Sequence, residues 1–320
     1  MKSLPTAMIA CGAALLGQNG PIPVGSGYTF PAPFYAAPGQ LVTLIVAEIG
    51  NTFSNTTQAS PGANLPTSLA GVSVGYFQGN LTGPLPILEV TPFWTCGGNP
   101  YYCGPLLAVT AQIPFEAQCT PCASNGGVAG GQLGTSVNGS ATAVSIYTTI
   151  VSDQVHILTS CDTFLSPVQE SVTVTPLPCP SIVAHADGSL VSATSPAKAD
   201  EELVAYAVGL GQTTPVSATG RLVSSPVPTA ATFMLDFNYH PNALPSRPLP
   251  TAPSPLFAGA TPGYVGLYQI NFAVPPTPVG TPPCVNTAGL PLGSNVVQSN
   301  LTVSVGGAFS FDGARICVAP

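Results

Sequence analysis

The chain has 320 residues, of which 45% are hydrophobic and only 5% are charged, and its formal net charge is −7 at pH 7. Its five scattered cations cannot displace counterions from a phosphate backbone, which excludes nucleic acid as a partner. No run of about 18 apolar residues occurs, so we expect no membrane-spanning helix.

The first 20 residues are typical of a weak secretory leader. Lys2 precedes the short apolar stretch "AMIACGAALLG", and "MIAC" resembles a lipoprotein cleavage box with Cys11 as the lipidated residue. An ordinary ordered N-terminal segment is the alternative interpretation. A leader predicts export, and therefore a location outside the cell or at its surface.

Residues 21–38, "PIPVGSGYTFPAPFYAAP", are predicted to form an extended entry segment, because no helix accepts prolines at this density. Strand-like runs then follow one another along the chain, separated by turn residues. In chain order they are 41–50, 69–77, 87–94, 106–116, 142–151, 170–177, 202–211, 231–239, 266–275, 300–307 and 311–320.

The stretch "ATPGYVGLYQINFAVP", residues 260–275, carries the clearest strand signal. Its large apolar residues share one parity, and smaller or polar residues take the other, which is the pattern of a half-buried strand. The residues of the apolar parity are Tyr264, Tyr268, Ile270, Phe272 and Val274.

These runs predict an all-β fold, since no amphipathic helix of convincing length accompanies them. The length suits two tandem antiparallel immunoglobulin-like β-sandwich domains. The two halves are also similar, because "APGQLVTLIVAEIG" and "LPTSLAGVSVGYF" have counterparts in "PAKADEELVAYAVGLG" and "VPTAATFMLDFNY". We place the first sandwich at residues 39–178 and the second at residues 179–320.

The nine cysteines indicate an oxidising compartment and disulfide-braced domains. With Cys11 assigned to the leader, an even number remains, which can form up to four disulfides. Short loops close most easily, so neighbours in the chain are the expected partners. The expected pairs are Cys96 with Cys103, Cys119 with Cys122, Cys161 with Cys179, and Cys284 with Cys317.

The spacing of "CTPC" at residues 119–122 also allows a redox dithiol or half of a zinc site. A zinc site needs a second pair of ligands, and a thioredoxin-like motif has to open a helix; neither feature accompanies this motif. We therefore expect a structural disulfide here.

Three stretches of the second half resemble a known family. "ADGSLVSATSPAKADEELVAYAVGLGQTTPVSATG", "GATPGYVGLYQINFAVP" and "NLTVSVGG" are similar to the Solibacter-type C-terminal domain family of secreted acidobacterial proteins, and "AAPGQLVTL", "LPTSLAGVSV" and "AQIPFE" resemble its upstream part. The resemblance spans roughly residues 30 to 310. It implies immunoglobulin-like or TIG-like β-sandwich modules of an exported protein, and it implies no catalytic residues. The cysteine-bearing insertion at 94–134 and the proline-rich insertion at 241–262 depart from the family pattern.

Motifs that might carry chemistry are weak. "GVSVG" at residues 71–75 matches the nucleophile-elbow pattern around Ser73, but the alternation of a strand runs through it, whereas an elbow needs a turn into a helix. His156, His185 and His240 lack a second ligand at metal-binding spacing. The acidic residues occur singly. We therefore assign no catalytic residue, no metal ligand and no cofactor, and we expect the protein not to be an enzyme.

The function predicted from these features is structural. A surface of low charge tolerates close association with copies of itself, and strand edges offer backbone groups to a neighbour. We expect a self-assembling fibre or surface-layer subunit, or an adhesion module that contacts other surface proteins.

The alternative is a carbohydrate-binding β-sandwich module. The stretch "TPFWTCGGNPYYCG" offers Trp94, Tyr101 and Tyr102 as an aromatic platform for glycans, in or beside a loop closed by cysteines. Rings that cover the core or an interface are the competing interpretation.

Overall fold

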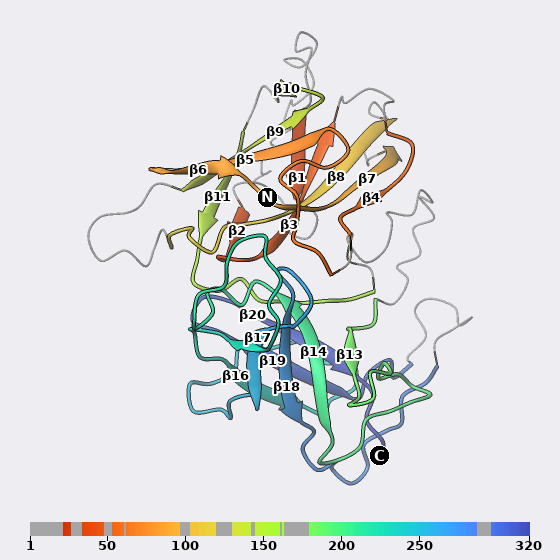
Figure 1. Cartoon of the computed structure of the whole chain (residues 1–320). Helices are drawn as coiled ribbons and strands as arrows, with labels where there is room; N and C mark the ends of the chain where they lie inside the picture. The colour runs from red at the N-terminus through yellow and green to blue at the C-terminus, as the bar shows by residue number, and fades with distance from the viewer. Residues whose placement is uncertain are drawn as a thin grey trace, which may run out of the picture.

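The computed structural model shows an all-β protein, with no helix among the residues it describes. Two pairs of β-sheets lie one above the other, and each pair encloses its own hydrophobic core (Figure 1). The residues described are 22–26, 34–47, 53–60, 62–96, 103–119, 130–141, 145–160, 162, 179–286 and 296–320.

The first core lies between a five-stranded and a six-stranded sheet in a β-sandwich-like arrangement. Fully buried Leu44, Tyr76 and Leu107 belong to this core. The five-stranded sheet has the order β1 (Ile22–Ser26), β3 (Leu41–Ala47), β8 (Cys103–Gln112), β7 (Ile87–Cys96), β4 (Thr57–Gln58). The six-stranded sheet has the order β2 (Phe34–Ala36), β11 (Ile146–Ile150), β9 (Gly131–Val137), β5 (Val72–Gln78), β6 (Leu81–Pro84), with β10 (Ser140–Ala141) beside β9.

Strands β1 and β2 come from the segment 21–38 that the sequence predicts to be an extended entry. In the structure this segment contributes an edge strand to each sheet of the first pair: β1 pairs antiparallel with β3, and β2 pairs parallel with β11. Thr148 and Val151 bind the ends of β2 by donating hydrogen bonds to the carbonyls of Phe34 (3.0 Å) and Ala36 (2.9 Å). The entry segment is thus paired within its own chain.

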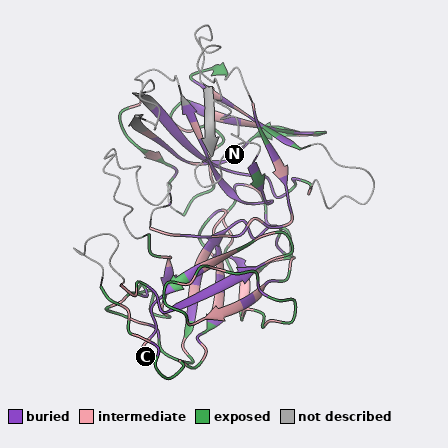
Figure 2. Ribbon diagram, turned by 180° about the vertical axis from the view of Figure 1, so that it is seen from behind, coloured by how far each residue is buried: buried purple, intermediate pink, exposed green. Residues whose placement is uncertain are grey.

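The second core lies between another six-stranded sheet and a three-stranded sheet. Figure 2 shows buried residues on the strands of both pairs of sheets. The six-stranded sheet has the order β12 (His156–Ile157), β14 (Glu202–Val208), β18 (Tyr268–Ala273), β17 (Phe257–Ala260), β15 (Val227–Pro228), with β13 (Val183–Ala184) also beside β14. The three-stranded sheet has the order β16 (Met234–Asn238), β19 (Leu301–Gly306), β20 (Phe311–Ile316).

The chain passes from the first core to the second between β11 and β12. Val155 and Ile157 already belong to the second core, so this passage comes before the domain boundary expected between residues 178 and 179. The two pairs of sheets also touch: Phe115, which follows β8, packs in the second core, and the ring centroids of Tyr35 on β2 and Phe309 lie 5.2 Å apart.

Strand β18 confirms most of the alternation in residues 260–275. Tyr268, Ile270, Phe272 and Val274, which share the predicted apolar parity, are buried on the core side. The prediction for Tyr264 was wrong, because its side chain is 59% exposed. Gly263 (φ 78°) and Gly266 (φ 71°) form a turn before the strand, and the turn breaks the two-residue period.

Residues 241–253 of the proline-rich insertion 241–262 cover the outer face of the three-stranded sheet, whereas its later residues 257–260 form β17 of the six-stranded sheet. The hydroxyl of Thr302 donates to the carbonyl of Ala243 (2.8 Å), and the N–H of Leu235 donates to that of Pro253 (2.7 Å). A Cβ at Gly306 would lie 2.7 Å from Pro248, so the insertion sits directly on the backbone of β19. As a result, every residue of β19 is buried.

Cys284 and Cys317 form a disulfide with Cα atoms 5.8 Å apart, one of the four pairings expected from the sequence. Cys119 and Cys179 are also disulfide-bonded, and their expected partners Cys122 and Cys161 lie outside the described residues. The other expected pair, Cys96 with Cys103, occupies facing positions on β7 and β8, although the side chains of these two residues are not described.

The assignment of buried and exposed residues around β18 can be tested by truncating one side chain in the strand and one in the turn before it. Phe272→Ala should lower the free energy of unfolding by about 3–5 kcal/mol, because it removes a fully buried ring. Tyr264→Ala should change it by less than about 0.5 kcal/mol. Urea denaturation of both variants measures these values, and equal losses would contradict the assignment of Tyr264 to the surface.

Candidate functional site

The residues singled out for function from the sequence are placed only in part. Trp94 lies in β7, but its side chain is not described, and Tyr101 and Tyr102 fall outside the described residues. The glycan platform built on these three rings stays a prediction. Ser73 lies within β5, whose buried neighbours Val72 and Val74 alternate with it; the strand therefore runs straight through "GVSVG".

The structure instead brings together a histidine, a serine and a glutamate from one stretch of the chain, residues 185–201. His185 follows β13, Ser195 lies in the next loop, and Glu201 immediately precedes β14. Nδ1 of His185 is 2.6 Å from Oε1 of Glu201, and its Nε2 is 3.3 Å from Oγ of Ser195. These residues line a pocket of about 350 Å³. Three side chains in this order could form a catalytic triad of the hydrolase type.

The hydrogen bonds around His185 do not suit a general base. Its Nε2 lies closer to the carbonyl oxygen of Ser195, at 3.1 Å, than to the hydroxyl of the same residue. The hydrogen bond with Glu201 raises the pKa of His185, which favours a doubly protonated ring that donates to both neighbours. The N–H of Ser195 donates to Ser192, so it cannot stabilise an oxyanion.

We therefore infer that the His185 cluster, formed by His185, Ser195 and Glu201, holds the loop before β14 in place. Glu201 also accepts a hydrogen bond from the N–H of Lys198 (2.8 Å). The hydrogen bonds of His185 to Glu201 and to Ser195 connect the two ends of the loop formed by residues 185–201. The sequence missed this pairing because His185 and Glu201 are 16 residues apart, and neither shows a spacing typical of a site.

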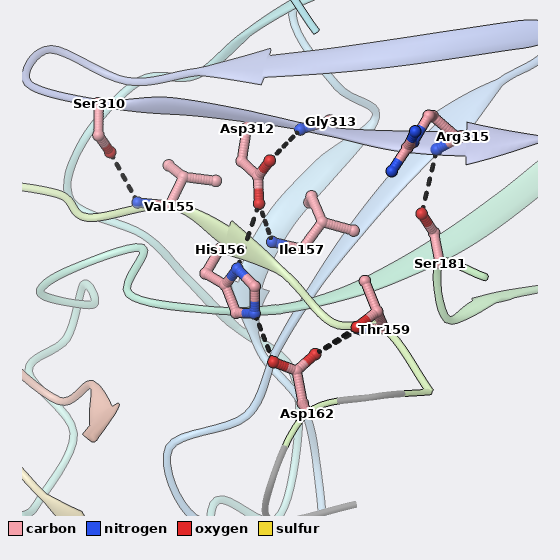
Figure 3. A network of polar contacts seen from close by, with 10 residues as sticks. All are labelled: Val155, His156, Ile157, Thr159, Asp162, Ser181, Ser310, Asp312, Gly313 and Arg315. Carbon is pink, nitrogen blue, oxygen red and sulfur yellow. Dashed lines mark hydrogen bonds and ion pairs between the residues drawn. The ribbon is translucent and has the colours of Figure 1, made fainter. Parts of the chain in front are cut away.

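A second histidine connects β12 to β20, in the three-stranded sheet (Figure 3). Nε2 of His156 lies 2.7 Å from Oδ1 of Asp162, and its Nδ1 lies 3.3 Å from Oδ2 of Asp312. Asp312 also accepts the N–H of Ile157 (2.8 Å), and Asp162 accepts that of Thr159 (2.5 Å). One imidazole thus bridges two carboxylates that belong to different parts of the chain.

The electrostatics of His156 favour its charged form. Burial alone would lower its pKa, but the hydrogen bonds and charges of Asp162 and Asp312 outweigh burial and raise the pKa to about 9. The same contact acts on its partner: burial would raise the pKa of Asp162, but the bond to His156 lowers it. At neutral pH the site is therefore an ion-paired triad of one cation between two anions.

A third carboxylate extends this contact. Asp153 is fully buried and accepts hydrogen bonds from the N–H groups of Phe309 (2.9 Å) and Ser310 (2.7 Å) in the turn before β20. The hydroxyl of Ser310 in turn accepts the N–H of Val155 (2.7 Å). Residues 153–162 are thus fixed to the β19–β20 hairpin by side chains instead of by a backbone ladder.

Within the described part of the chain, no group of three or more His, Cys, Asp or Glu residues is arranged to hold a metal ion. The same residues include no helix that is long and apolar enough to span a bilayer. No family model and no curated protein matches the chain. What the protein does must therefore be inferred from the geometry of its own residues.

The charge on His156 predicts how stability depends on pH. Its folded-state pKa of about 9 lies above the ordinary value of 6.5, so its stabilising contribution is complete below about pH 6.5 and is lost as pH rises through 9. That loss should amount to at most about 3 kcal/mol of unfolding free energy. The stability difference between wild type and His156→Gln, measured by urea denaturation, should shrink over this range. His240→Gln, at an exposed histidine, is the matched control, and a difference that does not change with pH would contradict the ion-paired triad.

The interpretation of the His185 cluster can be tested with a fluorophosphonate probe, which labels activated serines. We expect no labelling of Ser195, because Nε2 of His185 faces the carbonyl oxygen of Ser195 at 3.1 Å, and a nitrogen that donates to this oxygen cannot accept the proton of the hydroxyl. Labelling that is present in wild type and lost in Ser195→Ala would instead identify a hydrolytic site.

Proposed function

We propose that the chain is a non-enzymatic, extracellular structural protein whose tandem immunoglobulin-like sandwiches assemble with copies of themselves at or beyond the cell surface. The single observation that carries this proposal is the position of β1 and β2. Each strand completes the edge of one sheet of the first pair, and both belong to one proline-rich segment at the start of the described chain.

An edge strand of this kind can be exchanged between copies. The hydrogen bonds that β1 makes with β3, and β2 with β11, would be the same if the segment came from a second molecule. The pairing of β1 is short and shifts register between Pro23 and Gly25, so little has to be broken before exchange. Because a second molecule would supply the same pairings, including the buried contacts of Phe34 and Ala36 on β2, exchange gains a link between two molecules without a net loss of contacts.

The composition supports the same proposal. With only 5% charged residues, two copies approach each other with little electrostatic repulsion. The resemblance to modules of secreted proteins and the leader-like first 20 residues favour an extracellular location, and the disulfide between Cys284 and Cys317 suits an oxidising compartment.

The experiment is electron microscopy of the native material beside light scattering of the purified chain. We expect regular fibres or sheets from the full chain, and monomers from a variant that lacks residues 21–38. A synthetic peptide of residues 21–38 should bind the shortened chain in trans, because it restores both edge strands.

A peptide of the same composition in scrambled order is the control for specificity, and circular dichroism confirms that the shortened chain keeps its β structure. Unchanged oligomers after the deletion would exclude this segment as the exchanged element. A monodisperse full-length monomer at high concentration would overturn the assembly proposal itself.

A further inference from the structure

The six-stranded sheet of the first pair has an outer face without charge. None of the strands β2, β5, β6, β9, β10 and β11 contains Asp, Glu, Lys, Arg or His. The inward positions fill the first core, as expected for alternating strands. The outward positions carry aromatic rings, hydroxyls, amides and glycines, so any ligand of this face meets no fixed charge from these strands.

Two exposed rings lie in one row across this face. Tyr147 on β11 is directly opposite Gln132 on β9, which is directly opposite Phe77 on β5, which is opposite Thr82 on β6. Tyr147 is 56% exposed and Phe77 is 50% exposed, although both are large and apolar. The row therefore alternates ring, amide, ring and hydroxyl, with about 10 Å between the two aromatic positions, since two strand spacings separate them.

Glycines keep the surface beside Phe77 flat. Gly75, two residues earlier on β5, pairs with Gly134 on β9, so neither strand raises a side chain at this point. A Cβ at Gly75 would lie 3.2 Å from Cε2 of Phe77, which means that the ring leans back over the glycine. A ring that lies along a sheet presents one broad face to solvent.

We propose that this face, defined by Tyr147, Gln132, Phe77 and Thr82, binds a neutral, extended β-linked polysaccharide. A pyranose ring has flat C–H faces that stack on aromatic rings, and its hydroxyls bond to amide and hydroxyl side chains. The distance between the two rings is close to the length of one disaccharide unit in such a chain. The absence of charge matches an uncharged ligand and gives no advantage to an acidic one.

A second copy of the chain is the competing occupant, and the composition of the row favours the glycan. A dry contact between two such faces would bury Gln132 and Thr82 together with the rings, and buried amides and hydroxyls cost free energy unless they find partners. Sugar hydroxyls supply those partners along the whole row. This inference is independent of strand exchange, because none of its four residues belongs to the segment 21–38.

The test measures depletion of the full-length protein from solution by insoluble cellulose and by chitin. We expect at least one of the two to bind wild type, and binding to persist in roughly 0.5 M salt, because no charge pair is involved. The double variant Phe77→Ala/Tyr147→Ala should bind about tenfold more weakly or worse.

Two further variants separate the platform from general effects. Tyr264→Ala removes a ring of similar exposure from the second pair of sheets and should bind as wild type does. Gly75→Ala keeps both rings but places a Cβ 3.2 Å from Cε2 of Phe77, so the ring has to shift by a few tenths of an ångström and binding should weaken less than in the double variant.

Failure of both glycans to deplete wild type, or equal depletion of the double variant, would overturn the proposal. Light scattering identifies the competing occupant: a wild-type oligomer that becomes monomeric in Phe77→Ala/Tyr147→Ala, without glycan binding, would show that this face joins copies of the chain. Loss of assembly on deleting residues 21–38 would leave the glycan result unaffected.

Discussion

Two carboxylates, Asp153 and Asp312, hold the junction on which the rest of the structure depends. Both accept backbone N–H groups across the gap between residues 153–162 and the β19–β20 hairpin, and Asp312 also shares the imidazole of His156. The junction lies where the chain leaves the first core and enters the second, so these bonds fix how one pair of sheets continues into the other. The buried carboxylate of Asp153 is tolerated because it finds several donors, and the half-buried carboxylate of Asp312 also finds more than one.

Only 5% of the residues are charged, and this scarcity affects both the contacts within the fold and the character of the surface. Several charged side chains connect one part of the chain to another: His185 bonds to Glu201 at the loop before β14, and Arg247 donates to the carbonyls of Gly307 and Phe309. The strands around Phe77 carry no charged residue, and their outer face is polar or aromatic. Such a surface lacks long-range steering, so its contacts have to rest on shape, ring stacking and hydrogen bonds.

Local patterns predicted the all-β class and the buried side of β18, because alternation and turn residues are properties of neighbouring positions. They failed at Tyr264, where two glycines with positive φ reset the period within a few residues. They also could not pair His185 with Glu201, or align Tyr147 with Phe77, since these contacts depend on which strands become neighbours in the sheet. The described parts of the segment 21–38 are extended, as predicted, in β1 and β2, but sequence alone does not show in which molecule such a segment finds its partner.

The parallel pairing of β2 with β11 has a mechanical consequence. A pull on the chain ahead of β2, opposed by a pull on the segment that leaves β11 toward the second core, acts along the two strands in opposite directions. Because the strands run the same way, this load shears their hydrogen bonds together instead of opening them one after another. Bonds loaded together share the force, so this pairing resists such a pull more strongly than strands whose bonds open one at a time.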